Sequence, residues 1–324
     1  MKQLREEFRQ AASAACGNLP VLVRARGPLV HLLTNYVTVT DCVNAVLAIG
    51  GRAICSHASE EAAQVTSGAD ALVCNLGGTE YYDAMELSAA QAASSGIPLV
   101  IDPVGCAASE YRLNMCLHLT RAYHPTAIRG NYAEIAALTD GIFADEGGAS
   151  SEKESAPQRT GSAGLDSTGT LSLAEVSLLA SHMTAFARRY HTILIASGAV
   201  DLCTDGTRMI EVTGGTPALK RITGAGCLST GVLAAFLAAF DAEYAGADVK
   251  KTRTDAWQTA TGGSEDNSMP SKTASRIEAA AAAVRYVGLA GEYAQRAAFE
   301  TGTGAGHFHM YLMDFLSASD PAFQ

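Results

Sequence analysis

Residues 71–102 read ALVCNLGGTEYYDAMELSAAQAASSGIPLVID. The run Ala71–Asn75 is apolar until its last residue, and Pro98–Asp102 repeats that pattern, which indicates two buried strands. Between them, Thr79–Ser95 is rich in good helix formers, and Gly96 provides a stop for the helix that this stretch predicts. A strand, a helix and a second strand in this order predict two parallel strands joined by a crossover helix.

The same alternation continues along the chain. The further predicted elements are a short strand over Thr126–Arg129, a helix over Tyr132–Thr139 capped by Asn131, a helix over Ser172–Tyr190, a strand over Thr192–Ser197, and a hairpin of Val200–Thr204 with Arg208–Thr213. The predicted strands before the hairpin are continuous apolar runs, as in parallel sheets. The hairpin turns at an Asp-Gly pair and adds an antiparallel edge. The sequence therefore predicts an α/β layer fold.

Composition limits the class of protein. The chain has 324 residues, of which 48% are hydrophobic and 17% charged, so it can bury a large core. Its net charge of −10 argues against a broad nucleic-acid surface. Two stretches rich in Ser, Gly and charge, 141–170 and 250–275, are expected to be surface insertions. The remainder suits one large domain over 28–318, preceded by an N-terminal extension, 1–27.

Cysteine usage and the N-terminus indicate a reducing compartment. The eight cysteines are irregularly spaced and contain no CxxC pair, which argues against a zinc site and a dense disulfide framework. Acidic residues Glu6 and Glu7 interrupt the N-terminal segment, which lacks the apolar run of a signal peptide. The longest apolar stretch, 227–240, is too short to span a bilayer. We expect a cytoplasmic protein with no membrane partner.

Polar residues follow several predicted strands where each one ends. They are Asn75, Asp102, Arg129 with Asn131 and Glu134, and Ser197. In an open α/β sheet, ligands bind outside the carboxyl ends of the strands, so these side chains are expected to share one rim. Each residue alone also has a structural explanation, because Asp before Pro often forms a turn and Asn131 suits a helix cap. Their coincidence at four strand ends is the stronger indication.

The sharpest local signal is TGAGC, residues 223–227, followed by an apolar helix to Phe240. Small residues at a helix start leave backbone N–H groups accessible to an anion. Cys227 falls in the first helical turn, where the helix dipole favours a thiolate. The alternative interpretation is that Gly-Ala-Gly is only a tight entry into a buried helix, with Cys227 as a core residue.

In combination, these motifs resemble the hydroxyethylthiazole kinases of the ribokinase-like superfamily. The resemblance covers residues from about 28 to 316 outside the two insertions. It rests on the blocks HLLTNYV (31–37), SEEA (59–62), NLGG (75–78), DPVG (102–105), IRGNYAEI (128–135), SGAVD (197–201), TGAGC (223–227) and GAGHF (304–308). Most relatives in the superfamily have aspartate at the position of Cys227, whereas the thiazole kinases have cysteine. The implied fold is a mostly parallel sheet flanked by helices on both faces.

The resemblance also implies a reaction and its residues. ATP would phosphorylate the primary alcohol of 4-methyl-5-(2-hydroxyethyl)thiazole, a step of thiamine salvage, with Mg²⁺ as cofactor. The residues implied are Cys227 for catalysis, Cys55, Gly224 and Asn35 for the acceptor, Arg129, Ser197, Ala225 and Gly226 for ATP, and Asp102 and Glu134 for the metal. The family forms trimers with active sites at subunit interfaces, so a homotrimer is implied here.

Two departures from the family pattern keep other functions open. Cys55 stands where the family usually has a substrate-contacting methionine, and Ala199 stands where many relatives have glutamate. The nearest alternatives are a hydroxymethylpyrimidine kinase and an ATP-dependent hydrate dehydratase, against which Cys227 and the TNYV block argue. A cysteine hydrolase would need His57, His118 or His307 beside Cys227. A sensor would bind both ligands without catalysis.

Overall fold

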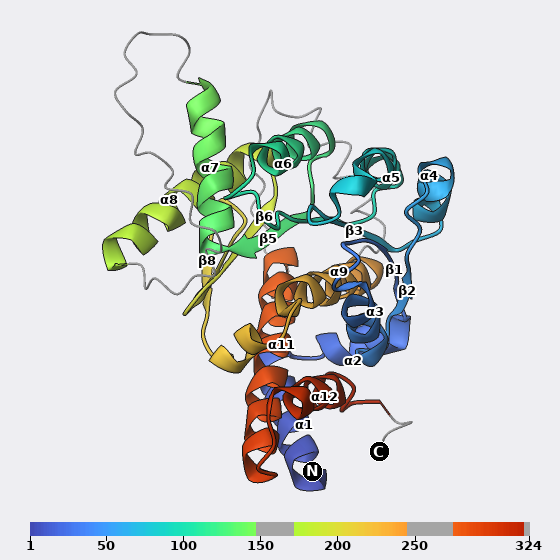
Figure 1. Ribbon diagram of the computed structural model, residues 1–324, viewed down its shortest axis with the longest axis vertical. Coiled ribbons are helices and arrows are strands. Elements are labelled where there is room, and N and C mark those ends of the chain that lie inside the picture. Colours follow the sequence, from blue (N-terminus) through green and yellow to red (C-terminus); the bar gives the residue numbers. More distant parts are fainter. Residues whose placement is uncertain (147–171, 245–274, 321–324) are drawn as a thin grey trace, which may run out of the picture.

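A single eight-stranded sheet runs through the molecule (Figure 1), and the computed structural model describes residues 1–146, 172–244 and 275–320. The strands are β1 (Leu29–Leu33), β2 (Arg52–Ile54), β3 (Ala71–Asn75), β4 (Leu99–Asp102), β5 (Ala127–Asn131), β6 (Ile193–Ser197), β7 (Asp201–Thr204) and β8 (Met209–Val212). Their order is β2-β1-β3-β4-β5-β6-β7-β8. All pairs from β2 to β6 are parallel, and β7 and β8 add the antiparallel hairpin that the sequence predicts.

Helices cover both faces of the sheet. They are α1 (Lys2–Cys16), α2 (Leu19–Arg26), α3 (Val39–Ala48), α4 (Ser59–Ser67), α5 (Tyr82–Ser95), α6 (Glu110–Tyr123), α7 (Tyr132–Glu146), α8 (Leu173–Tyr190), α9 (Ala225–Tyr244), α11 (Arg276–Glu300) and α12 (Ala305–Leu316), with short 3₁₀ helices η1 (Thr79–Tyr81) and η2 (Pro217–Arg221). Figure 1 shows α5–α8 above the sheet, and α3, α9 and α11 below it. The expected fold class, a mostly parallel sheet between two helical layers, is confirmed.

The central strands β3 and β4 have two buried faces, because neighbouring side chains point to opposite sides of a sheet. In β3, Val73 joins a core with α1–α3, α9, α11 and α12, whereas Leu72 and Cys74 join a core with α5–α8. Adjacent residues of β4 divide in the same way, with Val100 in the first core and Ile101 in the second. A continuous apolar strand therefore contributes side chains to the hydrophobic cores on both faces of the sheet.

Local signals set several element ends. Gly96 ends α5 in the left-handed conformation with φ 69°, as its position after the helix predicts. Ser172 and Glu175 form a capping box at the start of α8, where the side chain of Ser172 accepts a hydrogen bond from the N–H of Glu175. The helix predicted over 132–139 is longer than expected, because α7 continues to Glu146.

The remaining parts of the two expected insertions, 147–170 and 250–274, lie outside the described residues. Residues 141–146 belong to α7, and Ser275 caps α11. The N-terminal segment forms α1 and α2, which pack on the first core. Phe8 of α1 lies with its ring centroid 5.5 Å from that of Tyr286 in α11 and 5.5 Å from that of Phe315 in α12.

Helix α9 is the central helix of the first core. Its residues from Leu228 to Phe240 are all buried. It is 20 residues long, whereas the sequence indicated an apolar stretch of about 14, and the mean hydropathy of its most apolar window is 1.6. By length and composition it could cross a membrane, but 72% of that window is buried inside the protein, as in the core helix of a globular fold.

Candidate active site

The register of the sheet brings the strand-end polar residues together. Asn75 at the end of β3 lies opposite Asp102 at the end of β4. Asn131 at the end of β5 lies opposite Ser197 at the end of β6. The predicted rim at the carboxyl ends of the parallel strands is therefore present in the structure.

The first turn of α9 meets this rim. Gly224, Ala225, Gly226 and Cys227 are half-buried, whereas every residue from Leu228 to Phe240 is buried. The first residues of a helix have no carbonyl partner within it, so the N–H groups of Ala225, Gly226 and Cys227 are available to a ligand. These N–H groups lie beside the carboxylate of Asp102 and the guanidinium of Arg129. This arrangement suits an anionic ligand that binds together with a cation.

Position 224 requires glycine because of its backbone conformation and because Thr38 lies close to it. Its φ is +76°, and a Cβ atom built on it would lie 2.5 Å from Cγ2 of Thr38. Only glycine adopts this conformation readily and leaves room for the helix start to approach Thr38, the residue before α3. The close approach of the two helix starts places Cys227 beside the segment that follows β1.

Cys227 lies in a network of amide side chains. The Nδ2 atom of Asn75 donates to its Sγ at 3.2 Å, and the Nδ2 atom of Asn35 approaches the same sulfur at 3.7 Å. Asn35 also donates to Oδ1 of Asn75 at 3.2 Å, while its own Oδ1 accepts from the N–H groups of Val37 and Thr38. The structure therefore brings Cys227 and Asn35 together, through Asn75.

Asp102 is buried behind Cys227 and is 2% exposed. Its Oδ2 accepts from Nδ2 of Asn75 at 2.9 Å and from Oγ1 of Thr230 in α9 at 3.0 Å. Burial, and next the negative charge of Glu134, raise the pKa of Asp102 to about 7, although Arg129 and the two hydrogen bonds oppose this shift. A carboxylate held in this way favours a cation beside it.

Glu134 is tied to the backbone at the start of α7. Its Oε2 accepts from the N–H of Asn131 at 2.9 Å, and Oδ1 of Asn131 accepts from the N–H of Glu134 at 2.9 Å, which makes a reciprocal capping box. The other oxygen, Oε1, accepts from the N–H of Gly105 in the DPVG block at 3.0 Å. The predicted cap at Asn131 is confirmed, and the cap itself fixes the orientation of the Glu134 carboxylate.

Arg129 connects the strand ends to α9. Its Nη2 donates to Oγ of Ser197 at 2.9 Å. A Cβ built on Gly226 would lie 2.9 Å from its Nη1, so the absence of a side chain at Gly226 lets the guanidinium reach the helix start. Within the described part of the chain, its buried Nε has no hydrogen-bond partner. The guanidinium thus retains donor capacity for an anionic ligand.

The expectation of a thiolate favoured by the helix dipole is wrong for Cys227 in this structure. Burial, and next the charge of Asp102, raise the pKa of the thiol to about 11. Hydrogen bonds from Thr38 and Asn75 and the charge of Arg129 act in the opposite direction but do not outweigh burial. Burial outweighs these opposing effects, so the side chain is a thiol at neutral pH.

Cys55 is set apart from the Cys227 network. It follows β2, which is the edge strand and is separated from β3 by β1, and it packs against the first core as a half-buried residue. All eight cysteines are free, and Cys55 and Cys227 are the two that are not buried, which agrees with the expectation that the others act as small hydrophobic residues. Ala199 lies in the exposed turn between β6 and β7.

Each of the three histidines considered as a hydrolase partner of Cys227 has other neighbours. The ring of His57 lies 4.0 Å from that of Tyr81, Nε2 of His118 lies 2.8 Å from Oε2 of Glu86, and His307 lies beside Tyr311 on α12. Among the described residues, the side chains that hydrogen-bond Cys227 are Asn35, Asn75 and Thr38. The arrangement gives no support to a Cys–His pair.

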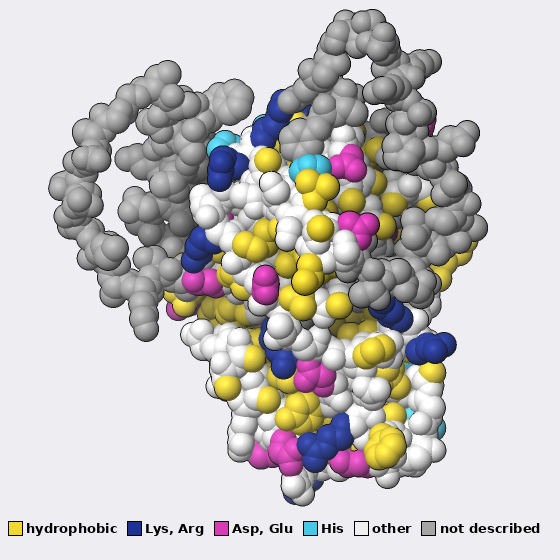
Figure 2. All heavy atoms as spheres, turned by 90° about the vertical axis from the view of Figure 1, so that its left-hand side faces the viewer, with side chains coloured by type: hydrophobic (Ala, Val, Ile, Leu, Met, Phe, Trp, Pro, Cys, Tyr) yellow, Lys and Arg dark blue, Asp and Glu magenta, His cyan; other side chains and the backbone are white. Residues whose placement is uncertain are grey.

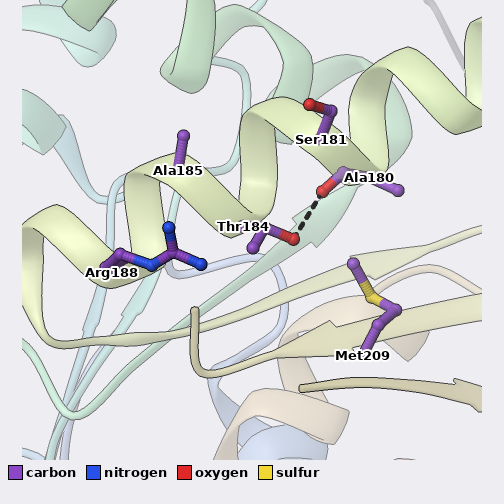
Figure 3. A pocket seen from close by; sticks show the side chains of 6 residues that line it. All are labelled: Ala180, Ser181, Thr184, Ala185, Arg188 and Met209. Atoms are coloured by element: carbon purple, nitrogen blue, oxygen red, sulfur yellow. Dashed lines mark hydrogen bonds between the residues drawn. The ribbon is translucent and has the colours of Figure 1, made fainter. Parts of the chain in front are cut away.

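A separate hollow with a volume of about 490 Å³ lies on α8 and β8 (Figure 3). Two of its polar side chains bind within the chain: Oγ1 of Thr184 donates to the carbonyl of Ala180, and Arg188 donates to the carbonyl of Gly206. Figure 2 shows the side of the molecule that is on the left in Figure 1, where hydrophobic side chains spread over the middle and charges of both signs are scattered among them. The carboxylates, the guanidinium and the thiol described above lie at the rim of the sheet. The rim, rather than this hollow, is therefore the candidate active site.

The sequence is similar to one family of known proteins. The model of the hydroxyethylthiazole kinase family matches residues 21–267. This chain belongs to the hydroxyethylthiazole kinase family. A hydroxyethylthiazole kinase of Desulforudis audaxviator is 38% identical over 67% of this chain and 72% of its own length, and one of Methanobrevibacter smithii is 31% identical over 92% and 90%.

A solved structure agrees with the fold. The hydroxyethylthiazole kinase protein of Pyrococcus horikoshii superposes with a TM-score of 0.67 and 25% identity, covering 100% of this chain and 96% of that one. The resemblance inferred from the motif blocks is thus confirmed, and with it the ribokinase-like fold. In this hydroxyethylthiazole kinase family member the rim residues are the candidate active site.

The sequence assigned no role to three residues that build the site. Thr38 lies against Gly224, and Thr230 donates a hydrogen bond to Asp102. Asn75 donates hydrogen bonds to both Asp102 and Cys227. Asn75 was visible as a strand-end residue but received no role. Thr230 had a weaker signal, because it and Ser229 are two hydroxyl residues near the start of a mostly apolar helix. Thr38 had none, because its contact is made by tertiary packing.

Proposed function

We propose that this chain transfers the γ-phosphoryl group of ATP to the primary alcohol of 4-methyl-5-(2-hydroxyethyl)thiazole. The observation that carries the proposal is the meeting of the TGAGC helix start with Asp102 and Arg129 at one rim, in a member of the hydroxyethylthiazole kinase family. Phosphoryl transfer depends on alignment and charge neutralisation more than on covalent help, and this rim offers donors, a cation and carboxylates for both.

The donor set fits Mg²⁺. Magnesium binds oxygen ligands and is commonly held by one or two carboxylates together with water and phosphate oxygens. Asp102 and Glu134 provide two carboxylates near enough for the charge of Glu134 to raise the pKa of Asp102. They would hold the ion directly or through water. When bound, the ion would neutralise charge on the phosphates of ATP.

Arg129 and the α9 amides are assigned to the phosphates. The guanidinium of Arg129 is held by Ser197 and lies against Gly226, with a donor to spare. The N–H groups of Ala225 and Gly226, with that of Cys227, would stabilise charge that develops on the transferring group. One preorganised donor of this kind contributes on the order of 10²–10³ in rate.

Cys227 is assigned a position beside the acceptor hydroxyl. A thiol with a pKa of about 11 is mismatched to proton abstraction at neutral pH, since a general base works best near the operating pH. Its contribution is therefore smaller than that of the amides and the carboxylates. We expect Cys227→Ala to lower turnover while ATP binding stays nearly intact; loss of ATP affinity in this variant would contradict the division of roles.

The remaining assignments concern the acceptor pocket and the assembly. Cys55, Asn35 and Gly224 would line the thiazole site, with Cys55 giving a wider pocket than methionine. We assign the enzyme to thiamine salvage in the cytoplasm, and propose a homotrimer with active sites at subunit interfaces. The exposed apolar pair Tyr36 and Val37, which are 75% and 58% exposed directly after Asn35, supports a neighbouring subunit there.

The test is ADP release by the purified protein with Mg·ATP, with and without hydroxyethylthiazole, together with mass detection of the phosphorylated product. Thiazole-dependent ADP release with stoichiometric product supports the proposal. A hydroxymethylpyrimidine preferred over the thiazole would overturn the acceptor. Tight binding of ATP and thiazole by the folded protein without ADP would overturn the activity in favour of a binding role.

A further inference from the structure

Asn75 is a buried amide whose four hydrogen-bonding positions are all occupied. It is 1% exposed. Its Oδ1 accepts from the N–H of Gly77 at 3.0 Å and from Nδ2 of Asn35 at 3.2 Å. Its Nδ2 donates to Oδ2 of Asp102 at 2.9 Å and to Sγ of Cys227 at 3.2 Å. An amide offers two donors and an oxygen with two lone pairs, so this side chain has no capacity left for a ligand.

The orientation of this amide is fixed by chemistry. The backbone N–H of Gly77 can only donate, so the atom facing it must be the oxygen of Asn75. The NH₂ group then faces Asp102 and Cys227. Gly77 is itself held close, since a Cβ built on it would lie 2.8 Å from that oxygen. A flipped amide would place NH₂ against an N–H donor and would lose both donations.

This orientation constrains both partners. The sulfur of Cys227 accepts a hydrogen bond, so its own S–H hydrogen points away from Asn75. Oδ2 of Asp102 accepts from both Asn75 and Thr230, so neither of these residues uses Oδ1. One amide on β3 thereby sets the direction of a carboxylate on β4 and a thiol on α9.

We infer that Asn75 is the positioning residue of the active site, holding the Cys227 thiol and the Asp102 carboxylate in a fixed mutual orientation through its amide NH₂. It touches neither ATP nor the acceptor. This inference rests on the proposed function for its kinetic consequence but not for its geometry. A purely structural amide would stabilise the rim without coupling these two groups.

The first test is kinetic and uses Asn75→Asp. The new carboxyl keeps the two acceptor positions toward Gly77 and Asn35 and removes the N–H donation to Cys227. It also places a second carboxyl against Asp102, so a shared proton replaces the fixed N–H donation there. We expect kcat to fall by about 10-fold or more while KM for the thiazole changes by less than about 3-fold, because orientation is lost without a ligand contact. Thr120→Val is the control, since its buried hydroxyl donates to the carbonyl of Cys116 within α6.

A double-substitution cycle tests whether Asn75 acts through Cys227. In the Cys227→Ala background, Asn75→Asp is expected to cost several-fold less in kcat than in the wild type, because one of the two groups it orients is gone. Equal costs in the two backgrounds would contradict the inference. An unchanged kcat for Asn75→Asp in the wild-type background would also overturn it.

The second test does not need catalysis and uses iodoacetamide alkylation of Cys227, followed by mass spectrometry across pH. The groups facing the thiol are Asp102 on β4, Arg129 on β5 and Cys42 on α3, besides Asn35, Thr38 and Asn75. In Asn75→Leu the thiolate loses an N–H donor, so at fixed pH alkylation slows and its pH midpoint rises. Loosened packing would instead speed alkylation, which would overturn the inference.

The two tests separate the inference from the proposed function. A wild-type protein without kinase activity would refute the function, and the alkylation profile would still decide the role of Asn75. Should Asn75→Leu fail to fold by thermal melting, Asn75→Ala supplies the same loss of the NH₂ donations with less bulk. Its alkylation must then be slower than that of the wild type, and a faster rate would count against the inference.

Discussion

The two halves of the rim differ in how completely their polar groups are paired. At the ends of β3 and β4, Asn75 and Asp102 are 1% and 2% exposed, and every polar position of the Asn75 side chain is used. At the ends of β5 and β6, Arg129 and Ser197 are half-buried, and Nε of Arg129 has no partner among the described residues. Both halves flank the same helix start.

We call the ends of β3 and β4 the preset half, because their polar groups are already paired. We call the ends of β5 and β6 the ligand-completed half, because Arg129 keeps donors for a ligand. Buried polar groups that are fully hydrogen-bonded resist rearrangement, because any movement leaves a group unpaired in a medium of low dielectric. The half-exposed guanidinium has spare donors, and an anionic ligand would occupy them. We therefore expect substitutions in the first half to act on turnover and substitutions in the second to act on ATP affinity.

The largest effect is expected for Asp102→Asn. The neutral side chain keeps an oxygen for Asn75 and Thr230 but loses the charge that would hold Mg²⁺, so kcat should fall by about 10² or more. The melting temperature should stay the same or rise, since a buried charge near Glu134 is removed. Coupled ADP assays and thermal melts measure both, and kcat within threefold of the wild type would contradict the assignment.

The second effect concerns Arg129→Gln. Hydrogen bonds to charged groups contribute about 1.5–3 kcal/mol, so loss of the guanidinium should raise KM for ATP by roughly 10- to 150-fold with a smaller change in KM for the thiazole. Arg188→Gln is the matched control, because that guanidinium binds the carbonyl of Gly206 at the hollow on α8. A larger effect on the thiazole than on ATP would reverse the assignment of the two halves.

A third test changes the helix start that the two halves share. Gly224→Ala adds a methyl group against Thr38 at a φ of +76°, and we expect it to lower the free energy of unfolding by about 2–3 kcal/mol and to reduce turnover. Gly302→Ala isolates the cost of positive φ, because its φ is +64° and no atom lies within 4 Å of the added Cβ. Equal losses in chemical denaturation would show that the contact with Thr38 has no role.

The smallest effect is expected for Ser197→Ala. The hydroxyl accepts one hydrogen bond from Arg129, and a typical contribution of about 0.5–1.5 kcal/mol corresponds to a rise of roughly 2- to 12-fold in KM for ATP. Turnover should change less than affinity. Steady-state kinetics at varied ATP provide the measurement, and a fall in kcat without any change in KM would place Ser197 in the preset half instead.

Much of the framework was predictable because single segments carry their own signals. Ala71–Asn75, Gly96, Asn131 and the Asp-Gly hairpin each specify a local conformation that tertiary packing does not override. The rim followed from one topological rule, since parallel strands end at the same edge. Roles at the rim came from the resemblance of the motif blocks, not from the residues singly.

What the sequence did not predict depends on distances between elements. The contact of Gly224 with Thr38 joins positions 186 residues apart, and only packing reveals it. The thiol pKa of Cys227 is a balance between a helix start and burial, and the depth of burial cannot be read from a motif. The four hydrogen bonds of Asn75 likewise require three partners from separate parts of the chain, Asn35, Asp102 and Cys227, to be placed beside it together with the nearby Gly77.

The most direct measurement is a pair of high-resolution crystal structures, without ligand and with Mg²⁺ and a non-hydrolysable ATP analogue. We predict that Asn75, Asp102 and Cys227 keep their mutual positions within about 0.5 Å, the tolerance of a preorganised site, while Arg129 gains phosphate oxygens as partners. Movement of Asn75 away from Cys227 or Asp102 on nucleotide binding, with Arg129 still held only by Ser197, would contradict the division between a preset and a ligand-completed half.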